Sequence, residues 1–211
     1  MNTEHPILFS TEMVRAILDG RKTQTRRPVK PQPPIGINAL WFGQNSPRKP
    51  ETSQPTGSFV YCGRDYVCPF GRIGDTLWVR ETWAISDDID GRELVAYRAG
   101  GTRLIAPGPT VTHGEHRCVR FVTRWTPSIH MPHWACRLFL RITDIRVERV
   151  RDISEEDAKA EGVDAVPGKG IHGWMPHALE FCLAWDSIYK KQKHGWDTNP
   201  WVWAITFEVI K

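Results

Sequence analysis

The chain of 211 residues is 40% hydrophobic and 25% charged, with a formal net charge of +4. These values are ordinary for a soluble globular protein, and the modest charge permits a nucleic-acid partner without requiring one. The five cysteines lack a framework spacing, residues 1–10 lack a secretory pattern, and no apolar run approaches the roughly 18 residues of a membrane span. These features argue against a disulfide scaffold and a membrane partner, and they predict a cytoplasmic chain with free thiols.

The first predicted elements are a short apolar strand at residues 7–9 and a helix at residues 11–19. Ser10 is suited to cap this helix, and Gly20 follows at the position where a left-handed backbone favours glycine. Four apolar residues recur at helical spacing and form one face of the helix: Met13, Val14, Ile17 and Leu18.

The next segment, Gly-Arg-Lys-Thr-Gln-Thr-Arg-Arg-Pro-Val at residues 20–29, is strongly basic. From Arg21 to Lys30 there are five basic residues and no acidic one. Unpaired Lys and Arg side chains are rarely buried. The segment is therefore either a solvated turn, favoured by the negative end of the preceding helix, or a site for an anionic or polar ligand.

A proline-rich stretch at about residues 30–71 follows, in which prolines repeatedly break any regular pattern. Trp41, Phe42 and Phe59 are its main apolar anchors. The stretch is interpreted as an insertion rather than a second domain, so residues 1–211 are expected to form a single domain.

The middle of the chain predicts strands separated by loops. Apolar residues alternate after the turn at residues 71–75, and residues 94–97 predict another strand. Residues 125–134 are broken by prolines and predict an ordered loop rich in aromatic residues. From Cys136 to Ile142 the apolar positions alternate clearly, and the alternation slips at Asp144, which predicts a bulge.

The last third predicts two helices and a strand. Ser154 with Asp157 resembles a capping box, and Gly162 ends that helix after Glu161. An amphipathic helix at residues 179–191 follows, and its apolar face is formed by Phe181, Cys182, Trp185, Ile188 and Tyr189. The final strand places Trp203, Ile205, Phe207 and Val209 on one face. Because strands do not alternate strictly with helices, the pattern predicts an α+β fold, a small mixed barrel flanked by about three short helices.

Three stretches resemble the ASCH domain family, and they occur in the order typical of that family. They are Ala-Ile-Leu-Asp-Gly-Arg-Lys-Thr-Gln-Thr-Arg at residues 16–26, Gly-Asp-Thr-Leu-Trp-Val-Arg-Glu at 74–81, and Ile-Ser-Glu-Glu-Asp-Ala-Lys-Ala-Glu-Gly-Val at 153–163. With Pro-Ser-Ile-His-Met-Pro-His-Trp-Ala-Cys-Arg at 127–137, the chain is similar to a tryptophan-rich branch found in phages and prophages.

The resemblance implies a PUA-like β-barrel, a fold that binds RNA or modified nucleobases. Small bacterial members hydrolyse N4-acetylcytidine with a lysine, a threonine and a glutamate, and these correspond to Lys22, Thr25 and Glu161. Thr25 would attack the acyl group, Lys22 would take the threonine proton, and Glu161 would assist. Because residues three apart on a regular strand point to opposite faces, the chain would have to turn or bulge between Lys22 and Thr25.

Eight further residues are candidates for binding the substrate or nucleic acid, namely Arg21, Arg26, Arg80, Glu81, Trp83, Trp125, His130 and Trp134. The tryptophans are either platforms on which a base stacks or barrel core. Arg80 and Glu81 either bind the edge of a base or pair with each other. His130 is either a pocket residue or a structural hydrogen-bonding residue.

Two stretches have residue types that can ligate zinc. These are His113, His116 and Cys118, and then His130, His133 and Cys136, with Cys62 and Cys68 as further candidates. No pair of Cys-x2-Cys knuckles is present, so the sequence predicts no metal and no other cofactor.

The sequence as a whole predicts a protein of the bacterial cytoplasm, encoded by a phage or prophage, that binds a nucleobase, nucleoside or RNA. It either hydrolyses an N-acyl group from cytidine or is a non-catalytic nucleic-acid-binding module. A phage structural or assembly accessory is a third class.

Overall fold

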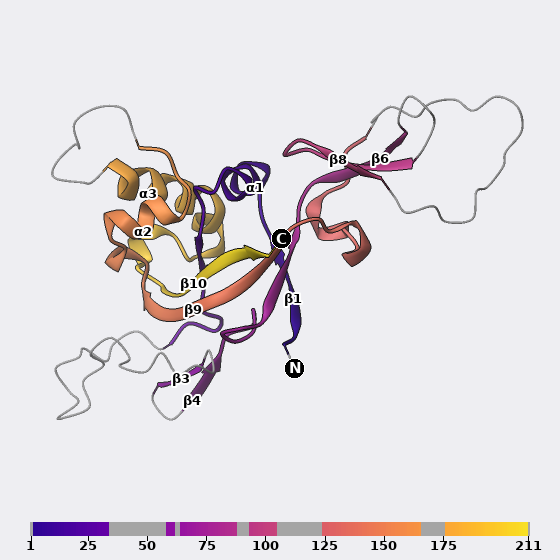
Figure 1. Cartoon of the computed structure of the whole chain (residues 1–211). Coiled ribbons are helices and arrows are strands. Elements are labelled where there is room, and N and C mark those ends of the chain that lie inside the picture. Colours follow the sequence, from indigo (N-terminus) through magenta and orange to yellow (C-terminus); the bar gives the residue numbers. More distant parts are fainter. Residues whose placement is uncertain are drawn as a thin grey trace, which may run out of the picture.

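The computed structural model describes residues 2–33, 58–61, 64–87, 93–104, 124–165 and 176–210, and these form an α+β fold with a central five-stranded sheet (Figure 1). The strand order is β1-β5-β9-β10-β2. Only β1 and β5 are parallel, and the other neighbours are antiparallel. The strands are β1 Glu4–Leu8, β2 Gln24–Pro28, β5 Thr76–Arg80, β9 Phe139–Arg149 and β10 Trp201–Ile210.

The central pair β9 and β10 contains the predicted bulge. Thr206 pairs with Asp144, whereas Phe207 pairs with Ile142, so Thr143 is the extra residue on β9. A bulge of this kind changes the parity of the residues that follow it. Ile142 and Ile145 are therefore both buried in the same core, three positions apart, as the slip in the sequence pattern predicts.

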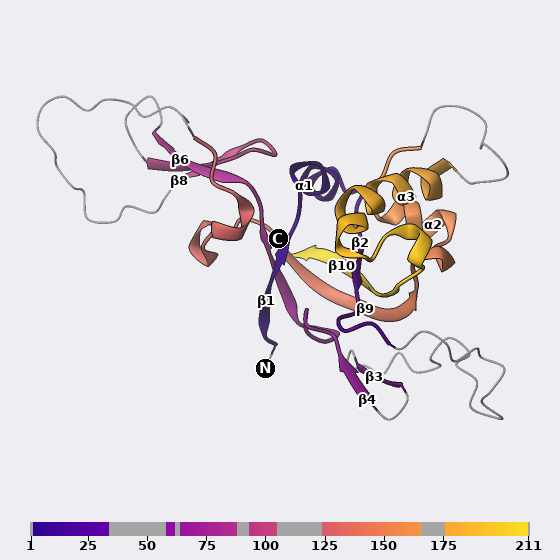
Figure 2. The same cartoon turned by 180° about the vertical axis from the view of Figure 1, so that it is seen from behind.

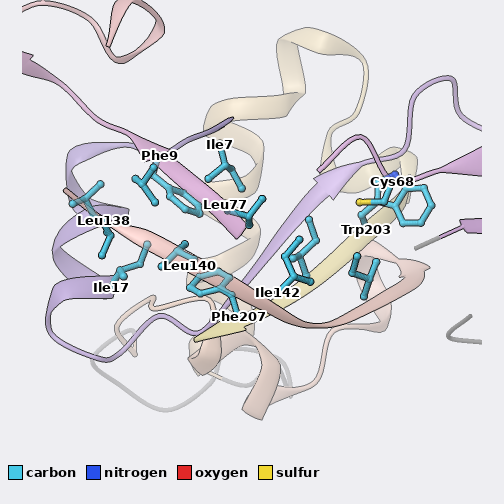
Figure 3. Packing of buried hydrophobic residues seen from close by; sticks show 14 of the residues in the cluster. Ile7, Phe9, Ile17, Cys68, Leu77, Leu138, Leu140, Ile142, Trp203 and Phe207 are labelled. Atoms are coloured by element: carbon cyan, nitrogen blue, oxygen red, sulfur yellow. The ribbon is translucent and has the colours of Figure 1, made fainter. Parts of the chain in front are cut away.

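The main core lies on the inner face of this sheet, where side chains from β1, β5, β9 and β10 interleave with α1 (Figure 3). The alternation predicted for β5 is confirmed, since Leu77 and Val79 are buried there. Strand β10 is buried on both faces. Trp203, Ile205 and Phe207 pack in the main core, and Val202 packs in a second core under α3.

Three α-helices are present in the described part of the chain, and local sequence signals position each of the first two. In α1, Thr11–Leu18, the side chain of Ser10 accepts from the Met13 N–H. In α2, Glu155–Ala160, the side chain of Ser154 accepts from the Asp157 N–H. Both caps were predicted, and the glycines that follow the helices, Gly20 and Gly162, have positive φ as expected.

Helix α3, Pro176–Tyr189, begins three residues earlier than predicted and covers the second core. Phe181, Trp185 and Tyr189 are buried at a spacing of four residues, which places them on one face. The predicted apolar face of this helix was wrong at Ile188, which is 39% exposed. The predicted apolar face of the last strand, β10, was likewise wrong at Val209, which is exposed. Among the described helices, none is long and apolar enough to cross a membrane.

Two smaller sheets extend from the central one. The hairpin of β3, Ser58–Tyr61, and β4, Arg64–Val67, lies within the predicted insertion. After it, Cys68 is buried in the main core. Trp41, Phe42 and Cys62 of that stretch lie outside the described residues. The second small sheet, β6 Trp83–Asp87, β7 Glu93–Tyr97 and β8 Thr102–Leu104, projects from the end of the molecule away from α2 and α3 (Figure 1 and Figure 2).

The closed barrel predicted from the sequence is not confirmed. Within the described residues, β1 and β2 are the two edges of the five-stranded sheet, and no strand pairing joins them. The edges nevertheless approach each other, since Arg27 on β2 donates from Nη2 to the backbone oxygen of Leu8 on β1, at 2.8 Å. The sheet is therefore strongly curled, and a side chain rather than a backbone ladder bridges its edges.

Candidate functional site

The basic segment forms an edge strand whose free side meets the end of α2. The Thr23 N–H donates to the Ala160 oxygen, and Lys22 and Glu161 form an isolated antiparallel bridge. Residues paired directly across an antiparallel bridge have their side chains on the same face. This backbone pairing, between residues 139 positions apart, is what brings the Lys22 and Glu161 side chains together.

Gly162 allows this close approach. A Cβ atom at Gly162 would lie 2.6 Å from the Cβ of Lys22 and 2.9 Å from the Cβ of Ala16, distances that side chains do not tolerate. Ala16 also fixes Lys22 from the other side, because its backbone oxygen accepts from the Lys22 N–H at 3.0 Å. The helix end, the glycine and the start of β2 therefore form one tightly packed unit.

The ammonium of Lys22 is completely buried, at 0% exposure, and Glu161 holds it twice. Nζ lies 2.8 Å from Glu161 Oε2 and 2.8 Å from the Glu161 backbone oxygen. It also lies 5.7 Å from the centre of the Phe9 ring. Burial lowers the pKa of Lys22, and the attraction of Glu161 opposes that shift without cancelling it.

Arg26 lies on the same face of β2, because residues 22, 24 and 26 alternate with the others along an extended chain. All five N–H groups of its guanidinium donate to side chains of the described chain. Nη1 bonds to Gln24 at 2.6 Å and to Glu161 Oε1 at 3.1 Å. Nε and Nη2 bond to Glu148, and Nη2 also bonds to Asp157 at 2.9 Å.

These contacts raise the pKa of Arg26. Burial opposes the charged form, but the three carboxylates of Glu161, Glu148 and Asp157 outweigh it. Arg146 completes the network at its outer end, with Nη2 at 3.0 Å from Asp157 Oδ2. The cluster therefore contains three cations and three anions, and in this conformation Arg26 has no N–H left with which to bind a substrate.

Thr25 lies on the opposite face of β2 from this network. It pairs with Ile205 of β10, which packs in the main core. Its hydroxyl is buried and has no hydrogen-bond partner in the described chain. The structure thus brings together two members of the predicted triad, Lys22 and Glu161, and places the third on the core face without a hydrogen bond to either, because Gln24–Pro28 is a regular strand.

The Phe9 ring lies near side chains from both faces of the segment that carries Lys22 and Thr25. Lys22 approaches its ring at 5.7 Å, and Arg27, which shares the core face with Thr25, lies 5.1 Å from the same ring centre. The lysine ammonium and the core face of β2 therefore meet around one aromatic ring, at the edge of the sheet.

Arg21 lies at the surface beside this unit. Its guanidinium donates to the Gly162 oxygen at 3.0 Å and contacts Asp19 at 3.1 Å and Asp164 at 3.3 Å. Its side chain is 42% exposed, whereas that of Arg26 is fully buried. Of these two predicted binding arginines, Arg21 is therefore the one that faces solvent near Glu161.

Of the two alternatives for Arg80 and Glu81, pairing of the two side chains with each other is wrong. Adjacent strand residues point to opposite faces, so the two side chains separate. Glu81 is buried and accepts two bonds from Arg137, at 2.8 Å and 3.0 Å. Arg80 instead donates to the Ile129 oxygen and lies 5.4 Å from the Trp78 ring centre. Neither side chain lies in the Lys22 cluster, although the Phe9 N–H donates to the Arg80 oxygen, which connects the two regions.

The remaining predicted binding residues gather around the 125–134 loop. Trp83 pairs through two backbone bonds with Thr126, and its ring meets that of Trp134 edge-on, with centroids 5.9 Å apart. Trp134 is 51% exposed, His130 is exposed and Trp125 is partly buried. The indole N–H of Trp83 is buried without a hydrogen-bond partner in the described chain.

The candidate metal ligands do not form a site among the described residues, where no group of three His, Cys, Asp or Glu side chains is positioned to hold an ion. His133 Nε2 lies 2.7 Å from Glu4, whereas the Cys136 thiol bonds to the backbone oxygens of Val79 and Leu138. His113, His116, Cys118 and Cys62 lie outside the described residues.

Comparison with protein families, with curated proteins and with solved structures found no match for this chain.

Proposed function

We propose that the protein is an ASCH-like member of the PUA-like superfamily that binds a nucleoside or RNA and hydrolyses an N-acyl group from cytidine. The observation that carries the proposal is the buried pair of Lys22 and Glu161, in which a lysine with a lowered pKa is held by a carboxylate at 2.8 Å. A lysine acts as a general base only when its surroundings favour the neutral form, and burial does this. The proposal places the protein in the bacterial cytoplasm, encoded by a phage or prophage.

The chemistry assigns a role to each of three side chains. Oγ1 of Thr25 attacks the acyl carbon of N4-acetylcytidine, and neutral Lys22 takes the hydroxyl proton. The C–N bond then breaks, the proton passes from Lys22 to the leaving amine, and cytidine departs. Water hydrolyses the resulting threonine ester, which releases acetate and restores the hydroxyl. Glu161 orients Lys22 and stabilises its protonated form during the step.

This mechanism requires Lys22 to reach the core face of β2. Lys22 Nζ lies 5.7 Å from the centre of the Phe9 ring, and Arg27, on the face of β2 that carries Thr25, lies 5.1 Å from the same centre, so the lysine would have to move past this ring. The buried hydroxyl of Thr25 makes no hydrogen bond in the described chain, so no existing bond has to break before it meets a substrate or Lys22. Exposed Arg21, beside Glu161, would meet an anionic part of the ligand.

Acetate release from N4-acetylcytidine tests the proposal. The wild type is expected to release acetate, and Lys22→Met, Thr25→Val and Glu161→Gln are expected to lower the rate at least about 100-fold. Lys159→Met and Thr23→Val are matched controls, because both positions are exposed and close to the site. A folded wild type without turnover on acylated cytidines would refute the enzyme, and equal rates in all variants would refute the residue assignment.

A non-catalytic nucleic-acid-binding module is the second candidate. The exposed Trp134, held edge-on against Trp83, is the observation that favours it, because an indole presented to solvent is a surface on which a base can stack. Titration of intrinsic fluorescence with short single-stranded RNA tests this candidate. RNA affinity that falls in Trp134→Ala, together with no acetate release by the wild type, would favour the module over the enzyme.

A further inference from the structure

The network around Arg26 is more elaborate than a single ion pair requires. The guanidinium is 0% exposed and lies between three carboxylates, only one of which contacts Lys22. Glu161 is divided between two cations, since Oε1 bonds to Arg26 and Oε2 bonds to Lys22. The orientation of the carboxylate that faces the lysine is therefore fixed by the arginine.

The fork of Arg26 is itself fixed from several directions. Gln24 accepts from Nη1, and the amide of Gln24 donates to Asp157 and to Thr206, both at 3.2 Å. The Phe181 ring of α3 lies 5.8 Å from the guanidinium carbon. A planar group with five donors in use cannot rotate without breaking several bonds, so it holds Glu161 more rigidly than a lysine could.

We propose that Arg26 is a positioning residue for Lys22, which acts by holding one oxygen of Glu161 so that only the other oxygen serves the lysine ammonium. This inference rests on the proposed role of Lys22 as the base, and it assigns Arg26 to that function in place of substrate binding. Because Arg26 shares the Glu161 carboxylate, this carboxylate neutralises Lys22 only in part, and the positive charge of Arg26 lies on its other side.

The charges that act on the Lys22 ammonium come from two elements. Glu161, after α2, favours the charged form, whereas Arg26 and Arg27 of β2 disfavour it together with burial. Removing the Arg26 charge has two effects of the same sign: it ends the repulsion, and it frees Glu161 Oε1 for Lys22. Both effects raise the pKa of Lys22.

The experiment measures the pKa of Lys22 by NMR of the 13Cε and 15Nζ nuclei in protein with labelled lysine, with the signal assigned from Lys22→Met. In Arg26→Gln the pKa is expected to rise by about one unit. Because this variant leaves Glu148 and Asp157 with less compensation, Arg26→Gln/Glu148→Gln is the companion variant that restores the charge balance. A shift below about 0.3 unit in either folded variant would overturn the proposal.

Arg146→Gln is the matched control. Arg146 belongs to the same network, but in the described chain its ion pairs are with Asp144, Glu148 and Asp157 and not with Glu161. The pKa of Lys22 is expected to stay within about 0.3 unit of the wild type in this variant. An equal shift in Arg146→Gln would mean that the overall charge of the network, and not the bond from Arg26 to Glu161, determines the pKa of Lys22. The proposal would then fail.

A measurement on the wild type needs no substitution. The Nη1 protons of Arg26 are expected as separate, slowly exchanging NMR signals, because both are hydrogen-bonded and buried. A single averaged signal, which indicates a freely rotating guanidinium, would contradict the proposal even if no variant folds.

These readouts separate the two proposals. A protein that releases no acetate but shows the expected rise of the Lys22 pKa in Arg26→Gln keeps the positioning role and loses the enzymatic one. If acetate is released, the acidic limb of the pH profile of kcat should move to higher pH in Arg26→Gln, by the same amount as the pKa of Lys22. KM should stay unchanged. A limb that stays in place, while the NMR pKa moves, would show that Lys22 is not the base.

Discussion

The Cβ that an alanine would place at position 162 lies 2.6 Å from the Cβ of Lys22, so the two chains meet there with no room for a side chain. Gly162 has a φ of +79°, which L-residues rarely adopt. The contact explains why the helix that ends at Glu161 can reach the start of β2. It also makes Gly162 a more sensitive probe of the site than any residue on the surface.

We predict that Gly162→Ala lowers the free energy of unfolding by about 2–5 kcal/mol, from backbone strain of about 1–2 kcal/mol and overpacking of about 1–3 kcal/mol. Gly20→Ala is the control, because Gly20 has a φ of +73° but an added Cβ would meet no atom within 4 Å. Denaturant unfolding should show a loss of only about 1–2 kcal/mol for Gly20→Ala. Equal losses in the two variants would mean that the close approach to Lys22 is not real.

The network also predicts how stability depends on acid. Burial opposes ionisation of Asp157, but Arg26 and Arg146 outweigh it and lower the pKa of this carboxyl from 3.8. A carboxyl with a lower pKa in the folded state contributes stability above its unfolded pKa, and that stability is lost as the pH falls through the folded pKa.

We therefore predict that the wild type loses stability as the pH falls below about 4 and that Asp157→Asn flattens this part of the curve. Asp152→Asn, an exposed carboxyl near α2, is the control. Thermal unfolding between pH 7 and pH 2 measures both. A curve for Asp157→Asn parallel to the wild type at low pH would contradict the assigned ion pairs.

The pair of Glu81 and Arg137 gives a third prediction. Glu81 is buried and its two bonds to Arg137 connect the end of β5 to the loop before β9, while Arg137 also lies 4.0 Å from the Tyr97 ring centre. Removing one partner of a buried pair leaves an uncompensated charge, which costs about 3–5 kcal/mol. Glu81→Leu and Arg137→Met should each cost about this much, whereas the double variant should cost less than either. Additive losses in a double-mutant cycle would show that the two side chains do not interact.

Local features of this fold were predictable from the sequence, and long-range pairings were not. Ser10, Ser154, Gly20 and Gly162 act within one turn of a helix, so their roles follow from neighbouring residues alone. The bulge at Thr143 followed from the change of parity along one strand. The meeting of Lys22 with Glu161 was expected only from the resemblance to a family, because 139 residues separate them.

The sequence did not reveal the ion pairs of Arg137, Arg146, Glu148 and Asp157. Their partners depend on how α2 packs on β2 and on how the loop before β9 packs. One signal was present: Lys22, Gln24 and Arg26 alternate, which places three polar side chains on one face and Thr25 on the other. The predicted closed barrel was not confirmed, because closure depends on which edge strands pair, and strand patterns do not reveal that.

Thr25 gives the last prediction, in which stability and function oppose each other. Its hydroxyl is buried in the described chain without a hydrogen-bond partner, a state that costs about 1–3 kcal/mol relative to an apolar group of the same shape. Thr25→Val keeps the volume and the β-branched shape that the strand favours. We therefore expect the free energy of unfolding to rise by about 1 kcal/mol while acetate release is lost. Thr206→Val is the control, because the Thr206 hydroxyl accepts from Gln24 at 3.2 Å and its loss should destabilise the protein. If Thr25→Val destabilises the fold as Thr206→Val does, the Thr25 hydroxyl makes a stabilising hydrogen bond and is not free to bind a substrate.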